Sequence, residues 1–314
     1  MTFEKLCHAH RAIAKPSFTL QVQEPHLTQP VFRFAPSPHG WLHLGHARSA
    51  LTGFECAHAV GGRFLVRLED RDALRCKPEF IDQIFADLDW LGIAWETPVL
   101  RQSEHLDVYR QAAARLTAMG LTYPCFASRT EIAAAAEPGR FDPDGAPFYP
   151  GLHRQLDVNE IARRIQQGEP HALRLDMAKA IARAATKTGD AALGFTELDD
   201  TGAPRFVAAD PSRWDDIVLM RKDGSASYHL AVVVDDARQG ITHVTRGMDL
   251  YASTDVHRLL QALLGLPVPI YQHHSLVLGA DGAKLSKSFG APSLKSMKSQ
   301  GFTATDIRRL AGFH

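Results

Sequence analysis

Cysteine is sparse in this sequence, and there is neither a long apolar run nor an excess of one charge. The four cysteines, Cys7, Cys56, Cys76 and Cys125, lie far apart and form no C-x-x-C pair. This spacing predicts a reduced cytoplasmic protein rather than a disulfide scaffold. No apolar run reaches the roughly 18 residues of a membrane span, so no membrane partner is expected. The 35 basic and 35 acidic residues balance, so a nucleic acid would be contacted through local patches.

Secretion signals and the usual phosphate-binding glycine fingerprints are also missing. Residues 1–30 contain no apolar segment followed by a small-residue cleavage site, and we expect a loose N-terminal extension there. The sequence has neither G-x-x-x-x-G-K-[ST] nor G-x-G-x-x-G after a strand, the two commonest nucleotide-binding loops. With 314 residues and 45% hydrophobic content, the chain is still long enough for one large domain or two smaller ones.

Strand and helix patterns alternate at both ends of the chain, which predicts an α/β fold with a parallel sheet. A short helix should follow the capping box SRTE (128–131), and 137–151 should be an exposed insertion. Residues 215–236 are interpreted as two strands joined by a hairpin turn at 222–225. The other expected elements are strands at 31–35, 63–70, 173–175 and 241–247 and helices at 43–60, 78–92, 104–119, 157–167 and 253–265, the last capped by Ser253 and stopped by Gly265.

The segment RFAPSPHGWLHLGHAR (33–48) joins a predicted strand to a predicted helix and places two histidines at the helix start. A helix start attracts anions through its unpaired N–H groups and its dipole, and His43 and His46 would add donors. A second donor set, Lys284 and Lys287, lies in a Gly/Ser-rich loop far along the chain. Each set alone is more often a packing or solvated surface feature. Both together on an α/β frame favour a polyphosphate site.

The segments HLGH (43–46) and KLSKS (284–288) resemble the two signature motifs of class I aminoacyl-tRNA synthetases. Four longer segments resemble the glutamate-specific branch of that family: RFAPSPHGWLHLGHAR (33–48), RLEDRD (67–72), YHLAVVVDD (228–236) and THVTRGMD (242–249). The resemblance runs from about Val31 to Leu294. It implies a Rossmann-type catalytic domain that activates L-glutamate with ATP.

The resemblance implies a binding site for an amino acid with two carboxylates. The residues that it places around glutamate are Arg33, Ala35, Ser37, Glu69, Tyr228 and Arg246. The residue types agree with this role. A carboxylate at the end of a strand, Glu69, can accept from an ammonium group, and the planar forks of arginines fit carboxylates.

The resemblance also places ATP, which is usually bound as its Mg²⁺ complex, at the helix start. ATP would be bound by His43, Gly45, His46 and Lys287. The catalytic residues would be His43, His46, Lys284 and Lys287. The protein has little covalent chemistry to perform in this reaction, so positioning and electrostatics should dominate the formation of glutamyl-adenylate.

The sequence ends at His314, 26 residues after Ser288, whereas glutamyl-tRNA synthetases continue into an anticodon-binding region. The chain therefore resembles the short glutamyl-queuosine tRNA(Asp) synthetases, which implies glutamate transfer to the cyclopentenediol of queuosine in the tRNA(Asp) anticodon. We expect a monomer. The implied organisation is an extension at 1–30, a first catalytic half at 31–105, an inserted α+β, acceptor-binding-like subdomain at 106–205, a second catalytic half at 206–275, and the KLSKS loop with a short helical segment at 276–314, without an anticodon-binding domain.

The family often carries a zinc site of pattern C-x-C…Y-x-x-x-C, and this chain matches that pattern only in part. Cys125 and Tyr149 match, Ala127 replaces the second cysteine, and His153 replaces the last one. Zinc prefers four ligands, mostly thiolate and imidazole, so the segment is one ligand short. We expect no metal there and simple packing of the loop.

Three other interpretations stay open from the sequence. A truncated glutamyl-tRNA synthetase that charges a tRNA 3′ end would share the motifs, although the length disfavours it. A non-catalytic, synthetase-like RNA-binding protein would usually lose signature residues that are kept here. Another nucleotidyl transferase with an HLGH-type motif, acting on a small acid, is disfavoured by VVVDD (232–236) and THVTRG (242–247).

Overall fold

The computed structural model of the protein describes residues 29–72, 74–189, 192–199, 201–277 and 292–313. Most of the expected N-terminal extension lies outside these ranges, as does most of the expected Gly/Ser/Lys-rich loop with Lys284 and Lys287. Within the described ranges, the helices are too short or too polar to cross a membrane.

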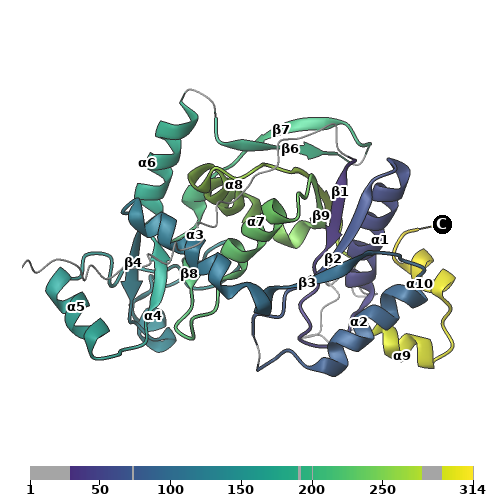
Figure 1. Ribbon diagram of the computed structural model, residues 1–314, viewed down its shortest axis with the longest axis horizontal. Coiled ribbons are helices and arrows are strands. Elements are labelled where there is room, and N and C mark those ends of the chain that lie inside the picture. Colours follow the sequence, from purple (N-terminus) through teal and green to yellow (C-terminus); the bar gives the residue numbers. More distant parts are fainter. Residues whose placement is uncertain (1–28, 73, 190–191, 200, 278–291, 314) are drawn as a thin grey trace, which may run out of the picture.

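Parallel strands form the centre of the fold (Figure 1). β1 (Val31–Phe34) pairs in parallel with β2 (Arg63–Leu68), which pairs in parallel with β3 (Glu96–Arg101). β9 (His243–Gly247) pairs in parallel with β10 (Ile270–His274). This arrangement confirms the expected α/β fold with a parallel sheet of Rossmann type.

The two sets of parallel strands meet between β1 and β9. The Thr242 N–H donates to the Val31 carbonyl at 3.0 Å, and the Val31 N–H donates to the Thr242 hydroxyl at 2.8 Å. The strand order is therefore β3-β2-β1-β9-β10, followed by β6 (Gly194–Leu198) and β7 (Pro204–Ala208). The chain runs outward from β1 to β3 and returns at β9, so the order reverses between β1 and β9.

Helices cover this sheet because their apolar faces pack against it. α1 (Leu44–Ala59) packs on β1, β2 and β9, and its buried face includes Ala47, Ala50 and Leu51. α2 (Pro78–Trp90) shares the same core and begins at a proline, as predicted. Strand β1 is buried along its whole length, which explains why Val31, Phe32 and Phe34 are apolar and why its one charged residue, Arg33, is paired within the protein.

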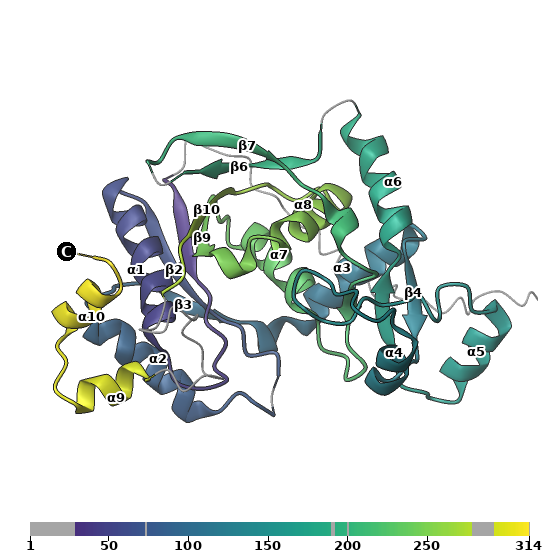
Figure 2. The ribbon, with the colours of Figure 1, turned by 180° about the vertical axis from the view of Figure 1, so that it is seen from behind.

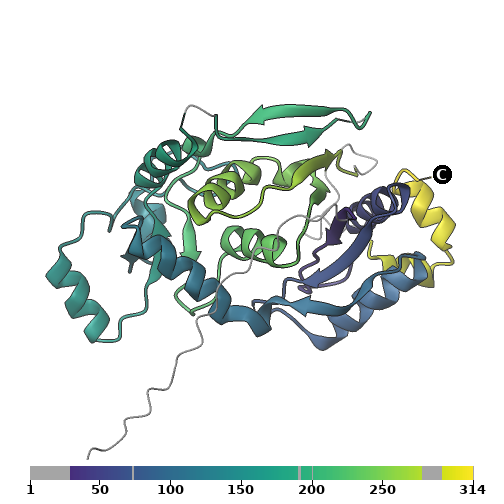
Figure 3. The same cartoon turned by 45° about the horizontal axis from the view of Figure 1, so that its top comes forward.

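The middle of the chain forms a separate antiparallel sheet, seen with its helices to the left in Figures 1 and 3. Its strands are β4 (Thr122–Cys125), β5 (Ala172–Leu175) and β8 (Val218–Met220). The accompanying helices are η1 (Gln102–His105), α3 (Leu106–Ala118), α4 (Arg129–Ala135), α5 (Val158–Gln166), α6 (Met177–Thr188) and η2 (Pro211–Arg213). The predicted capping box of α4 is present, with mutual bonds between Ser128 and Glu131.

The prediction of two strands at 215–236 is wrong in its second half. The turn exists, since the Arg221 N–H donates to the Ser225 carbonyl at 2.8 Å, but it leads into helix α7 (Tyr228–Arg238). Ser227 caps this helix by accepting from the Leu230 N–H. Residues 230–236 are all buried. Helical periodicity cannot appear in a run that is apolar on every side, and its valines favour a strand.

A smaller correction concerns the start of one helix, and several elements were not predicted at all. α8 (Ser253–Leu264) has Ala252 as its N-cap, so Ser253 is its first residue and not its cap; Gly265 ends it in the left-handed conformation, as predicted. Six strands and helices were not predicted: β3, β4, α6, β6, β7 and β10. The short helical segment that was expected near the C-terminus consists of α9 (Leu294–Ser299) and α10 (Ala304–Leu310). Most of the unpredicted elements are short, and their neighbours in space are distant in sequence.

The C-terminal helices return to the first half of the sheet. α9 and α10, yellow in Figure 2, lie beside α1 and α2. The Leu294 N–H donates to the Leu42 carbonyl at 2.8 Å, and Ser293 forms an isolated β-bridge with His43. The chain after residue 291 is therefore anchored directly at the start of α1.

Candidate active site

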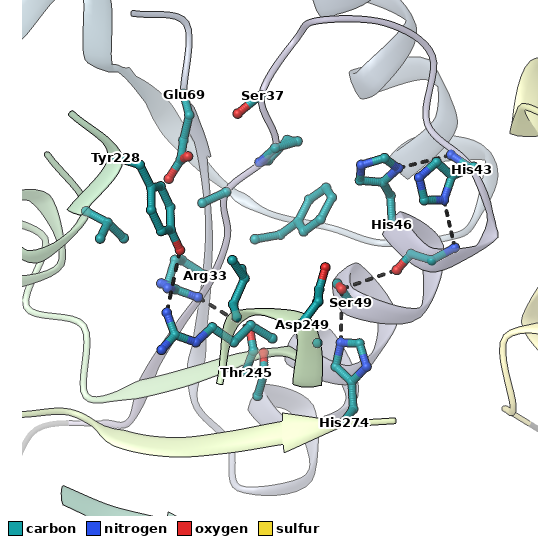
Figure 4. Close-up of a pocket in the computed structure, with 18 of the residues that line it drawn as sticks. Arg33, Ser37, His43, His46, Ser49, Glu69, Tyr228, Thr245, Asp249 and His274 are labelled. Atoms are coloured by element: carbon teal, nitrogen blue, oxygen red, sulfur yellow. Dashed lines mark hydrogen bonds between the residues drawn. The ribbon is translucent and has the colours of Figure 1, made fainter. Parts of the chain in front are cut away.

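A cavity of about 610 Å³ opens at the carboxyl ends of β1 and β9, where the strand order reverses. Its volume is in the ordinary range for small-ligand sites, and its position is where open α/β sheets bind ligands. The ends of β1 and β2, the start of α1, the start of α7, and the segments after β9 and β10 all contribute to it. Figure 4 shows most of the residues that line it.

The cavity brings together every predicted site residue that lies in the described part of the chain. These residues are Arg33, Ala35, Ser37, His43, Gly45, His46, Glu69, Tyr228 and Arg246. Lys284 and Lys287 lie outside that part. The described chain stops at Val277, which lines the cavity, and resumes at Pro292, next to Ser293, which bridges to His43. Val277 and Ser293, which flank the residues outside the described ranges, therefore both lie at the cavity or at the start of α1.

The start of α1 is organised by its two histidines. His43 is the N-cap, and its Nδ1 accepts from the Gly45 N–H at 3.1 Å. The Nδ1 of His46 accepts from the His43 N–H at 3.2 Å. Because each Nδ1 accepts, each neutral ring carries its proton on Nε2, which makes that atom a donor. The first turn contains no acidic residue, so nothing there opposes an anion.

Several lining residues were not predicted, among them Ser49, Arg71, Thr245, Asp249 and His274. Ser49 Oγ lies 2.9 Å from His274 Nε2, which joins α1 to the end of β10. The helical spacing 43, 46, 49 could have indicated Ser49, because residues three apart share a helix face. His274 gave no such signal, since β10 itself was not recognised.

Arg33 is already paired within the protein. Its Nε donates to Asp236 Oδ1 at 3.0 Å and its Nη2 to Oδ2 at 3.4 Å. Arg67, fully buried, donates to the same Oδ1 at 2.7 Å. Burial would raise the pKa of Asp236, but the charges of Arg33 and Arg67 lower it below its ordinary value. The carboxylate is therefore ionised and holds both guanidinium groups in place.

Glu69 follows β2 and is buried at the cavity wall. Its carboxylate oxygens lie 3.6 Å from an Nη of Arg67 and 3.9 Å from an Nη of Arg71. Burial raises the pKa of Glu69, while Arg71 and Arg67 oppose that shift. These ion pairs are long, so the carboxylate keeps the capacity to accept from a ligand's cation.

Arg246, on β9, is buried and surrounded by neutral acceptors. Its Nε donates to His273 at 3.1 Å, its Nη1 to His257 at 3.1 Å, and its Nη2 to the Thr254 hydroxyl at 2.5 Å. The hydroxyl of Tyr228 lies 3.5 Å from Nη1 (Figure 4). The cavity thus has a carboxylate and two arginines on one wall, and a helix start on the other.

The segment with the partial zinc pattern is packed by hydrogen bonds. Cys125 Sγ lies 3.3 Å from the Tyr149 hydroxyl, which accepts from the His153 N–H at 3.2 Å. The Nδ1 of His153 accepts from the N–H groups of Phe126 and Ala127 at 3.2 and 3.3 Å. Within the described ranges, no three histidine, cysteine, aspartate or glutamate side chains gather as a metal site.

Comparison with known proteins gives a consistent family match. The family model for the catalytic domain of class I tRNA synthetases (E and Q) matches residues 30–310. A glutamyl-Q tRNA(Asp) synthetase of Rhodobacter capsulatus is 45% identical over 90% of this chain and 99% of its own length. A glutamate–tRNA ligase of Coprothermobacter proteolyticus is 37% identical over 86% of this chain and 55% of its own length.

Solved structures agree with this match. The glutamate-tRNA synthetase of Elizabethkingia anophelis superposes with a TM-score of 0.67 at 28% identity, covering 84% of this chain. A glutamate tRNA ligase of Elizabethkingia meningosepticum, solved in complex with its amino acid, gives a TM-score of 0.66 at 28% identity. The chain spans about half the length of these two proteins, 53% and 54%.

Proposed function

Because the chain belongs to the class I tRNA synthetases of the glutamate and glutamine group, we propose that it is an ATP-dependent ligase acting on L-glutamate. It activates glutamate as glutamyl-adenylate and transfers the glutamyl group to queuosine in the anticodon of tRNA(Asp). The observation that carries the activation step is the cavity between β1 and β9, which sets glutamate-type donors and acceptors opposite an anion-binding helix start.

Glutamate would occupy the wall formed by β1, β2, α7 and β9. Arg246, whose guanidinium meets only neutral acceptors among the described residues, takes the side-chain carboxylate. The Tyr228 hydroxyl lies close enough to Arg246 to share that carboxylate. Glu69 takes the α-ammonium group, with Ser37 and Ala35 lining the same wall. This leaves the α-carboxylate directed toward the helix start.

We propose a smaller role for Arg33 than the resemblance implies. Asp236 engages two of its nitrogens, so its charge is partly compensated within the protein, although Arg67 shares the same carboxylate. We assign it a secondary contact with glutamate and give Arg246 the main electrostatic role. The difference matters for specificity, because an uncompensated buried guanidinium favours a carboxylate over an amide of the same shape.

ATP would lie across the start of α1. His43 and His46 donate from Nε2 to its phosphates, and the backbone at Gly45 approaches closely because that residue has no side chain. From the KLSKS motif we assign Lys284 and Lys287 to the phosphates as well; in sequence they lie between Val277, which lines the cavity, and Ser293, which bridges to His43. Mg²⁺ carried by ATP would neutralise part of the phosphate charge. The glutamate α-carboxylate attacks the α-phosphorus, and pyrophosphate leaves.

The acceptor is proposed from the relatives. The Rhodobacter capsulatus protein, matched over 99% of its length, is a glutamyl-Q tRNA(Asp) synthetase, and the Symbiobacterium thermophilum protein of the same name is 42% identical over 86% of this chain. A hydroxyl of the cyclopentenediol of queuosine would attack the acyl carbon of glutamyl-adenylate and release AMP. The inserted subdomain proposed at 106–205, which contains β4 and β5, would contact the RNA.

We also propose that the segment at 125–153 needs no zinc. Ala127 supplies no ligand, and the Nδ1 of His153 is engaged by two backbone N–H groups. The contact of Cys125 with Tyr149 joins the same residues that a metal would join. Hydrogen bonds thus hold this segment together in the way that a zinc ion would. The reaction proposed above has no step that requires zinc.

The activation step is tested by amino-acid-dependent exchange of labelled pyrophosphate into ATP, without tRNA. Glutamate should support exchange. Glutamine should be slower by about 10⁴-fold, because a site built for a polar partner strongly rejects an analogue that leaves it unpaired. Aspartate, one methylene shorter, should be poor because it cannot reach Arg246 and Glu69 together. Equal exchange with glutamine would contradict the assignment of this wall to glutamate.

A further inference from the structure

Behind the cavity, Arg246 is held by a set of side chains that the reaction itself does not use. The exposed fraction of Arg246 is 5%, and its three nitrogens donate to His273, His257 and Thr254. These acceptors come from two elements, β10 and α8, and together they fix one guanidinium on β9. A buried, fully ordered arginine of this kind has a single orientation.

None of these partners carries a negative charge. Among the described residues, no carboxylate lies within ion-pairing distance of Arg246, whereas Arg33 and Arg67 both contact Asp236. Burying a guanidinium without a counter-charge is costly, and a ligand carboxylate in the cavity would offset that cost. The charge of Arg246 is therefore available to pair with a ligand carboxylate that enters the cavity.

The proton positions on the two histidines follow from their second partners. His273 Nδ1 lies 2.8 Å from Glu197 Oε1, so it carries the proton and leaves Nε2 as the acceptor for Arg246. His257 Nε2 lies 3.3 Å from His229 Nδ1. His257 therefore donates from Nε2 to His229 and accepts from Arg246 at Nδ1. Both rings are neutral, and both protons point away from Arg246.

Glu197 is itself fixed, although it does not contact Arg246. Its other oxygen accepts from Arg205 Nη2 at 2.6 Å, on the neighbouring strand β7. The carboxylate thus orients His273 from behind, with the imidazole between it and the guanidinium. Burial, with the charge of Arg246 adding to it, lowers the pKa of His273 to about 2 and the pKa of His257 well below its ordinary value. Both shifts agree with neutral rings.

We propose that His273, oriented by Glu197, and His257, oriented by His229, are positioning residues that present Arg246 uncompensated to the substrate and so set the preference for glutamate over glutamine. The proposal rests on the proposed function, since it names the residues that tune its amino-acid site. A carboxylate in place of either histidine would pair with Arg246 and remove that preference.

The test compares His273→Phe, which keeps a flat ring but removes the acceptor, with His273→Gln, which restores an acceptor. His273→Phe should raise the KM for glutamate about 10- to 100-fold, the usual loss for one hydrogen bond to a charged group. The KM for ATP should stay within about twofold, and the glutamate-to-glutamine preference should fall by a similar factor. His273→Gln should recover a large part of both.

A matched control is available on β9. His243 stacks on Phe32 with ring centroids 4.7 Å apart and hydrogen-bonds to Thr242, away from Arg246. His243→Phe should leave both KM values and the amino-acid preference unchanged. If His273→Phe also leaves the glutamate KM unchanged, or raises the ATP KM equally, the ring is only a packing element and the proposal fails.

A spectroscopic measurement separates this proposal from the function on which it rests. The ¹⁵N shifts of ring-labelled protein, assigned through the loss of one histidine signal in His273→Gln, should show the Nδ1–H tautomer for His273 at neutral pH. The Nε2–H tautomer or a charged ring would overturn the proposal, even in a fully active enzyme. Absence of glutamate-dependent exchange in the unmodified protein would overturn the proposed function instead, whatever the tautomer.

Discussion

Acid should destabilise this protein in a way that His273 makes measurable. In the folded protein His273 is neutral, because burial and the neighbouring Arg246 lower its pKa to about 2. In the unfolded chain its pKa returns to about 6.5. Between these values the unfolded chain binds one more proton than the folded protein. The free energy of unfolding therefore rises with pH in this window, and stability is lost as pH falls below about 6.5.

The size of the effect follows from the two pKa values. Between about pH 7 and about pH 5, proton binding to His273 in the unfolded chain alone lowers the free energy of unfolding by about 1.9 kcal/mol. The slope reaches about 1.4 kcal/mol per pH unit once this histidine is fully protonated in the unfolded chain. Other groups titrate in the same range. The pKa of Asp87 is raised by burial to about 6, which has the opposite sign. The contribution of His273 must therefore be obtained as a difference from a variant.

The assay is urea unfolding of the unmodified protein and of His273→Gln at about pH 7, 6 and 5. The glutamine variant lacks the titrating ring, so the stability advantage of the unmodified protein should shrink by about 1.9 kcal/mol across this range. A difference that does not change with pH would refute the assignment of a depressed pKa. An advantage that grows in acid would mean that His273 is charged and paired with Glu197.

Three further predictions concern the helix start, the KLSKS segment and the metal. Gly45→Ala would place a methyl group 3.0 Å from the His43 ring; we expect the KM for ATP to rise about 10-fold, by loss of one to two hydrogen bonds, with an unchanged Tm. Lys287→Ala should lower the rate of pyrophosphate exchange by about 10²–10³ with unchanged glutamate affinity; a large loss of glutamate affinity at normal turnover would contradict its assignment to phosphate. Elemental analysis after dialysis should find clearly less than one zinc per chain; stoichiometric zinc would instead make His153 the replacement ligand.

The fold could be predicted where local pattern and burial agree. The segment from 31 to 90 combines a buried strand, a glycine-containing loop and two helices with apolar faces, and each was placed within a few residues. Residues 228–238 failed because α7 is buried on nearly all sides. A valine-rich run of that kind has no visible period, so only its neighbours in space decide between helix and strand.

The candidate site could be predicted to the extent that motif residues line it. The resemblance to known motifs found Arg33, Glu69 and Arg246, and the structure brings them to one cavity. The role of the residues behind Arg246 could not be predicted from the sequence. His273 and His257 lie on different elements, and β10 was not recognised as a strand. Their role depends on burial and on the direction of single hydrogen bonds, neither of which a linear pattern contains.

We propose that glutamate is transferred to queuosine and not to a tRNA 3′ end. The most direct measurement offers the protein ATP, labelled glutamate and three tRNA(Asp) samples: one with queuosine, one with guanosine in its place, and one with queuosine but without its 3′-terminal adenosine. We expect label on both queuosine-containing samples and none on the guanosine sample. Equal labelling of the guanosine sample, or loss of label when the 3′ adenosine is removed, would contradict it in favour of ordinary 3′-end charging.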